Sequence, residues 1–158
     1  MEEEIVSIEK NGTWKLVSRP NNTTIIGLKW VFKVKRDANG SISKYKARLV
    51  AKGYLQQPGI NFEEVFAPVA RIETVHILIA LAASKGWELH HLDVKSAFLY
   101  GELQEEVFVH QPEGFIKTGK EDLVYKLVKA MYGLRQAQCT WNMKLDGILK
   151  KMKFHRCV

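Results

Sequence analysis

The feature that most constrains this 158-residue chain is a pair of alternating segments joined by a short turn. Trp30, Phe32 and Val34 alternate with Val31, Lys33 and Lys35, which is the two-residue period of a β-strand. The tetrapeptide Asp-Ala-Asn-Gly at residues 37–40 has the composition of a hairpin turn, and a second alternating run covers residues 42–51. The pattern therefore predicts a β-hairpin.

One face of the second predicted strand is basic. Side chains two residues apart point to the same side of a strand, so Lys44, Lys46 and Arg48 share a face. Such a row suits phosphate, because arginine can make two parallel hydrogen bonds to it and lysine acts as a point charge. A solvated charged strand without a ligand is the alternative reading.

The composition agrees with a polyanionic partner. Lysine and arginine number 24 against 17 acidic residues, a formal charge of +7, which makes nucleic acid the leading candidate. The hydrophobic content of 46% is enough for the core of one domain or two small subdomains. Because the N-terminus does not resemble a signal peptide and no apolar run approaches about 18 residues, we expect an intracellular protein without membrane contact.

The remaining patterns predict both helices and strands. An apolar run over residues 72–85, closed by Gly86, predicts a buried helix with a glycine cap. Alternation over residues 87–94 predicts a strand, whereas the first 22 residues contain only turn signals. Shorter patterns predict three further elements: β-segments near residues 107–109 and 123–127, and a helix over residues 140–151.

Three longer blocks carry a family resemblance. They read KWVFKVKRDANGSISKYKARLVAKGYLQQPGINFEEVFAPVARIET, LHHLDVKSAFLYGELQEEVFVHQPEGF and VYKLVKAMYGLRQAQCTW. In these blocks and their order, the chain resembles copia-type retrotransposon reverse transcriptases from about Trp14 to about Leu149. Several long blocks in one order are more specific than a short motif.

The resemblance implies an α+β fold, namely the fingers and an incomplete palm of the right-hand polymerase fold, with an antiparallel sheet and helices. We expect an N-terminal lead-in segment over residues 1–22 and a fingers-like hairpin region over residues 23–70. Residues 71–158 would then form a partial palm that ends before the second catalytic aspartate motif.

The resemblance also implies roles for residues of the second block. Asp93 of LDVKSAFL matches the first metal-binding, catalytic aspartate, and the backbone carbonyl of Val94 would assist it. Phe98 matches the bulky side chain that lies beneath the sugar and excludes a 2′ hydroxyl. Without the family, Asp93 reads more simply as a helix N-cap and Phe98 as a core aromatic.

Further residues are implied to bind the nucleotide and the nucleic acid. Lys46 and Arg48 match basic fingers residues that meet the incoming triphosphate, and Gln136 matches the glutamine near the nascent base pair. The proline usual after this Gln-Ala pair is replaced by Gln138. We expect contacts with the nucleic acid from four more residues: Lys33, Lys35, Lys44 and Arg135.

The implied activity is RNA-directed DNA synthesis with Mg²⁺, deoxynucleoside triphosphates and a template-primer of RNA or DNA. The family's Tyr-x-Asp-Asp motif has no counterpart, because the chain contains no Asp-Asp pair. One carboxylate cannot fix two metal ions, so we expect this chain to be inactive alone. The alternatives are a non-catalytic nucleic-acid-binding remnant and a fragment that a second chain complements through an exposed palm edge.

Overall fold

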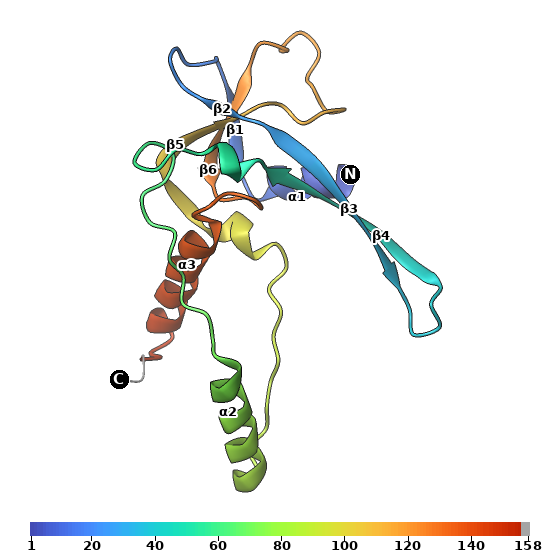
Figure 1. Ribbon diagram of the computed structural model, residues 1–158, viewed down its shortest axis with the longest axis vertical. Helices are drawn as coiled ribbons and strands as arrows, with labels where there is room; N and C mark the ends of the chain where they lie inside the picture. Colours follow the sequence, from blue (N-terminus) through green and yellow to red (C-terminus); the bar gives the residue numbers. More distant parts are fainter. Residues whose placement is uncertain (156–158) are drawn as a thin grey trace.

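The computed structural model describes residues 1–155, which form a body from which a hairpin and a helix extend (Figure 1). A four-stranded sheet in the order β1-β6-β5-β2 forms the centre of the body. Its strands are β1 (Trp14–Val17), β2 (Ile25–Ile26), β5 (Glu102–Val109) and β6 (Val124–Lys129). β6 pairs antiparallel with β1 and β5, and β2 pairs parallel with β5. The predicted β-segments near residues 107–109 and 123–127 are thus confirmed.

The predicted hairpin is also confirmed. β3 (Leu28–Arg36) pairs antiparallel with β4 (Ile42–Ala51) in a separate two-stranded sheet. The Asp37 carboxylate closes the turn by accepting two backbone N–H bonds of 2.9 Å, and Gly40 supplies a positive φ of 82°. The inner end of β4 is anchored in the core by Leu49, whereas the turn extends away from the body (Figure 1).

The N-terminal segment contributes more than turns. α1 (Glu2–Lys10) buries Ile8 in the core, and β1 places Trp14 in a stacked contact with Tyr125, with ring centroids 4.2 Å apart. The sequence analysis missed both elements. Their hydrophobic patterns are too short to be recognised. A nine-residue helix with one buried side chain, for example, repeats its apolar face too few times to give a clear period.

The apolar helix is present but exposed, so the prediction of a buried helix was wrong. α2 (Ile72–Lys85) has the predicted bounds, and Gly86 caps it in the left-handed conformation with φ 64°. However, α2 lies away from the body (Figure 1), only Ala82 is buried, and the side chain of Ile77 is 66% exposed. An apolar helix needs a partner surface, and residues 1–155 do not provide one. No helix in this part of the chain is long and apolar enough to cross a membrane.

The strand predicted over residues 87–94 does not form, and this prediction was wrong. The segment has no regular secondary structure, and Leu92 is 84% exposed. A strand requires a neighbour to pair with its N–H and C=O groups, and no strand of the described chain pairs with this segment. A short 3₁₀ turn, η2 (Ala97–Tyr100), returns the chain to the body before β5. α3 (Ala137–Lys151) begins three residues earlier than predicted.

Two glycines allow the hairpin base to meet a distant loop. The N–H of Ala51 donates a 2.8 Å hydrogen bond to the carbonyl of Tyr132, and a second 3₁₀ turn, η1 (Gly53–Leu55), follows β4. A Cβ on Gly53 would lie 2.0 Å from the carbonyl oxygen of Gly133, and a Cβ on Gly133 would lie 2.2 Å from the oxygen of Ala51. Side chains at these positions would therefore push the two backbones apart.

We predict that Gly53→Ala destabilises the chain by about 1–3 kcal/mol, because the added methyl group overlaps backbone that cannot move alone. The measurement is urea unfolding followed by circular dichroism. Gly147→Ala is the matched control: its Cβ meets no atom within 4 Å, so inside α3 it should stabilise by about 0.5–1 kcal/mol. Equal effects of the two substitutions would contradict the proposed backbone contact.

Candidate functional site

Most basic side chains of the hairpin lie on one face. The register pairs Lys33 with Lys46 and Lys35 with Lys44, and directly paired residues of antiparallel strands share a face. Arg48 continues this row towards the body, opposite Val31. Like charges that face each other across strands are destabilising unless an anion lies between them. We call Lys33, Lys35, Lys44, Lys46 and Arg48 the basic face.

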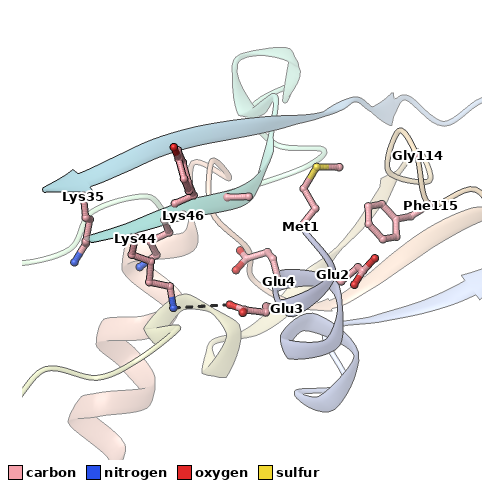
Figure 2. Close-up of a pocket in the computed structure, with 11 residues that line it drawn as sticks. Met1, Glu2, Glu3, Glu4, Lys35, Lys44, Lys46, Gly114 and Phe115 are labelled. Atoms are coloured by element: carbon pink, nitrogen blue, oxygen red, sulfur yellow. Dashed lines mark ion pairs between the residues drawn. The ribbon is translucent and has the colours of Figure 1, made fainter. Parts of the chain in front are cut away.

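The first turn of α1 brings acidic side chains to the basic face. Figure 2 shows Glu3 reaching towards Lys44, and their Oε2 and Nζ atoms are 3.9 Å apart. Together α1 and the hairpin line a pocket of about 730 Å³, which also includes Lys35 and Lys46. Because the sequence analysis assigned no structure to these acidic residues, it did not find this pocket.

Glu4 is the most constrained acid in this group. Burial raises the pKa of its carboxyl, and this effect outweighs the hydrogen bond from the Leu49 backbone and the attraction of Arg48 and Lys46, which lower it. Its Oε1 atom is buried and has no hydrogen-bond partner. The half-buried carboxylate is therefore held close to the basic face at a cost in desolvation.

Two of the residues predicted to bind the nucleotide meet on one ring. The guanidinium carbon of Arg48 lies 4.6 Å from the ring centroid of Tyr132, within the range of a cation–π contact. Phe98, in η2, packs edge-on against the same ring with centroids 5.2 Å apart. Arg48, Phe98 and Tyr132 form what we call the aromatic cluster. Tyr132 lies within the third block of the family resemblance, and the sequence analysis gave it no role.

Asp93 and Val94 lie in the irregular segment that precedes η2, and both are exposed. The negative charge of Asp93 is close enough to contribute to raising the pKa of Tyr132, although burial is the larger cause. Asp93 thus lies on the same side of the molecule as the aromatic cluster. The simpler reading of Asp93 as a helix N-cap was wrong, because the N-cap position of η2 is Ser96.

Gln136 is buried, with 1% of its surface exposed. Its side-chain oxygen accepts a 3.0 Å hydrogen bond from Gln56, and its side-chain nitrogen donates a 2.8 Å bond to the carbonyl of Asn61. Gln56 also accepts the N–H of Arg135 at 2.8 Å. The Gln136 side chain therefore fastens the start of α3 to the segment after β4, and its contact with a base pair stays a prediction.

Arg135 and Gln138 lie on either side of Gln136 in the sequence. The guanidinium of Arg135 lies 5.5 Å from the ring centroid of Phe62, and its Nε donates a 3.2 Å bond to Gly53. Gln138 occupies the first turn of α3, where backbone N–H groups have no intrahelical acceptor. The family's proline would lose no helical hydrogen bond there, so its replacement leaves the start of the helix intact.

The described residues do not fit a two-metal centre. Within residues 1–155, no group of three or more His, Cys, Asp or Glu side chains is arranged to hold a metal ion. Asp93 is exposed, and the chain contains no Asp-Asp pair that could complete a carboxylate cluster. Hard divalent cations require several oxygen ligands, and Asp93 with the Val94 carbonyl supplies only part of such a set.

We predict that ionised Glu4 lowers stability as the pH rises. Its folded pKa lies above the ordinary value of 4.5, so the folded state holds its proton more tightly than the unfolded state does. The stabilisation by protonated Glu4 is therefore lost as the pH rises from the unfolded pKa through the folded pKa. Urea unfolding between pH 4 and pH 7 measures this change, and Glu4→Gln should reduce it. Glu121→Gln is the control, since the pKa of Glu121 is lowered by backbone hydrogen bonds; an equal effect of both variants would contradict the assignment.

Comparison with known proteins identifies the family. The family model described as reverse transcriptase (RNA-dependent DNA polymerase) matches residues 11–158. The chain is 47% identical over 154 residues to the Pol polyprotein of transposon TNT 1-94 from Nicotiana tabacum, covering 98% of this chain and 12% of that protein. The Pol polyprotein of transposon RE1 from Arabidopsis thaliana is 43% identical over 145 residues, covering 91% of this chain and 10% of its own length.

A more distant relative is the Gag-Pol polyprotein of transposon Ty1-H from Saccharomyces cerevisiae, 30% identical over 132 residues, which are 80% of this chain and 7% of that protein. The chain thus spans about a tenth of the length of these relatives. No solved structure matches it significantly. With a family match over nearly the whole sequence and high identity to plant transposon polyproteins, the chain belongs to the reverse transcriptase (RNA-dependent DNA polymerase) family of copia-type retrotransposons.

Proposed function

We propose that this chain provides the fingers and part of the palm of a retrotransposon RNA-directed DNA polymerase. Residues 23–70 would be the fingers region and residues 71–158 the partial palm, preceded by the segment 1–22. The observation that carries the proposal is the convergence of Arg48 and Phe98 on one ring at the inner end of the basic face. A triphosphate would bind along Lys46 and Arg48, and its sugar would lie against Phe98.

The outer part of the basic face suits the phosphates of the template or primer. Lys33, Lys35 and Lys44 project from a hairpin that extends away from the body, where a long polyanion can approach it (Figure 1). Arg135 and Gln136 would contribute to template binding mainly by holding the segment after β4 in place through their hydrogen bonds to it. A direct contact by Gln136 requires its side chain to leave Gln56 and Asn61.

Metal-dependent catalysis is proposed to need carboxylates beyond Asp93. Family membership implies a general dependence on divalent metals, and bound Mg²⁺ supplies charge stabilisation at the reacting phosphate. In this chain Asp93 would be the catalytic ligand, with the Val94 carbonyl beside it. Because these groups do not complete a two-metal site, we propose that the chain does not extend primers by itself.

A second candidate is non-catalytic binding of nucleic acid. It is favoured by the two lysine pairs, Lys33 with Lys46 and Lys35 with Lys44, whose mutual repulsion a phosphate backbone would relieve. Association with a second chain is compatible with either candidate. The apolar side chains of α2 and of residues 87–94 are exposed and would be covered by such a partner.

Primer extension separates these candidates. With an RNA template, Mg²⁺ and deoxynucleoside triphosphates, we predict that the purified chain and its Asp93→Ala variant both give only background extension. Addition of a second chain that supplies the missing carboxylates should give more extension than the second chain alone if complementation occurs. Extension by the unaltered chain that Asp93→Ala abolishes would contradict the proposed inactivity.

Binding of single-stranded RNA in graded salt tests the basic face. We predict that the double variant Lys44→Gln, Lys46→Gln binds more weakly and that its slope of log affinity against log salt falls by about 1.4, or about 0.7 for each lost phosphate contact. The control carries the same charge change at Lys117 and Lys120, which lie outside the hairpin. A control that loses as much affinity as the test variant would show that net charge, and not the basic face, determines binding.

A further inference from the structure

The backbone of Tyr132 is fixed to the base of the hairpin. Its carbonyl accepts the N–H of Ala51 at 2.8 Å, and the next residue, Gly133, lies in contact with the backbone of Ala51 and Gly53. Buried Met131 precedes Tyr132 in the core. The Cα of Tyr132 therefore cannot move independently of β4, the strand that carries Lys46 and Arg48.

The side chain of Tyr132 connects elements that are far apart in the sequence. Its ring lies under the Arg48 guanidinium at 4.6 Å and against the edge of Phe98 at 5.2 Å, so it contacts both β4 and η2. The charged groups around it are Arg48, Glu4 and Asp93. No other residue within the described chain has ring contacts with both Arg48 and Phe98.

The phenol is protonated at neutral pH. Burial raises the pKa of Tyr132, the charge of Arg48 lowers it, and Glu4 and Asp93 raise it. The half-buried hydroxyl is thus a neutral group that can both donate and accept a hydrogen bond. A neutral ring also attracts the guanidinium through its face without neutralising the charge that a phosphate would use.

We propose that Tyr132 is the positioning residue of the candidate nucleotide site, where its ring fixes the separation between Arg48 and Phe98. The ligand is a deoxynucleoside triphosphate, whose phosphate chain binds Arg48 and whose sugar packs on Phe98. The inference rests on the proposed function and deepens it by assigning the residue that joins these two subsites. The backbone of Tyr132 is also hydrogen-bonded to Ala51 at the hairpin base. A movement of the hairpin at its base would therefore change both subsites together.

The test is a titration of the purified chain with dATP and, separately, with ATP in one magnesium-containing buffer, followed by NMR. The variants are Tyr132→Phe, which keeps the ring, and Tyr132→Leu, which removes it. Tyr54→Leu is the matched control, since Tyr54 is 66% exposed in η1. The Arg48 Nε–Hε resonance reports the ring contact directly, because an aromatic ring shifts the resonance of a proton held over its face.

We expect Tyr132→Leu to weaken dATP binding by about fivefold, the size of a moderately buried cation–π contact, and to reduce the preference for dATP over ATP. Tyr132→Phe should restore both the affinity, to within about twofold, and the Arg48 resonance. Tyr54→Leu should change neither. A change in the dATP to ATP preference would not follow from a general loss of stability.

Two results would overturn the inference, and they are distinguishable. If the unaltered chain binds dATP but Tyr132→Leu leaves its affinity and its preference over ATP unchanged, Tyr132 is not the positioning residue and the proposed function stands. If the unaltered chain binds neither nucleotide, the proposed nucleotide site fails and the inference fails with it. Should Tyr132→Leu lose its helical circular dichroism, Tyr132→Met replaces it, with the same outcomes required.

Discussion

The candidate site depends on the close contact between two backbone segments, at Gly53 and Gly133. There the hairpin base and the loop before α3 approach too closely for any side chain, and the Ala51 to Tyr132 hydrogen bond holds them in register. The buried side-chain amides of Gln56 and Gln136 hydrogen-bond to each other, and Gln56 accepts the N–H of Arg135, so they connect the same two segments. We call this set of contacts the backbone joint. Because of this joint, β4 and Tyr132 keep a fixed relation even though about eighty residues separate them.

The charged side chains of the hairpin and of α1 determine the character of the surface beside this contact. The register directs the basic face to one side of the hairpin. The first turn of α1 places Glu3 and Glu4 near Lys44 and Lys46 of this face (Figure 2). Two acidic residues cannot neutralise the five positive charges of the basic face, and the exposed Glu3 to Lys44 pair contributes little stability. The basic face therefore remains available to a polyanion, with the acidic turn as a local competitor for its outer lysines.

The sequence predicted the elements whose pattern is local and missed those that depend on partners. Alternation and turn residues were sufficient for the hairpin, and an apolar run with Gly86 gave the bounds of α2. Burial of α2 and pairing of residues 87–94 depend on surfaces that the described chain does not provide, so both predictions failed. In the site, Arg48 and Phe98 both contact Tyr132, and their roles at a nucleotide stay predictions of the family resemblance. The central place of Tyr132 and the burial of Gln136 arise from long-range packing that has no sequence period.

We propose that the aromatic cluster and the adjoining part of the basic face form one nucleotide-binding surface. The most direct measurement is a map of backbone and side-chain NMR shifts over the whole chain on addition of dATP. We expect the largest shifts to fall on Lys46, Arg48, Phe98 and Tyr132, with little change in α2 or at the far end of α3. Shifts concentrated outside the hairpin base and η2, for example along α3, would contradict it.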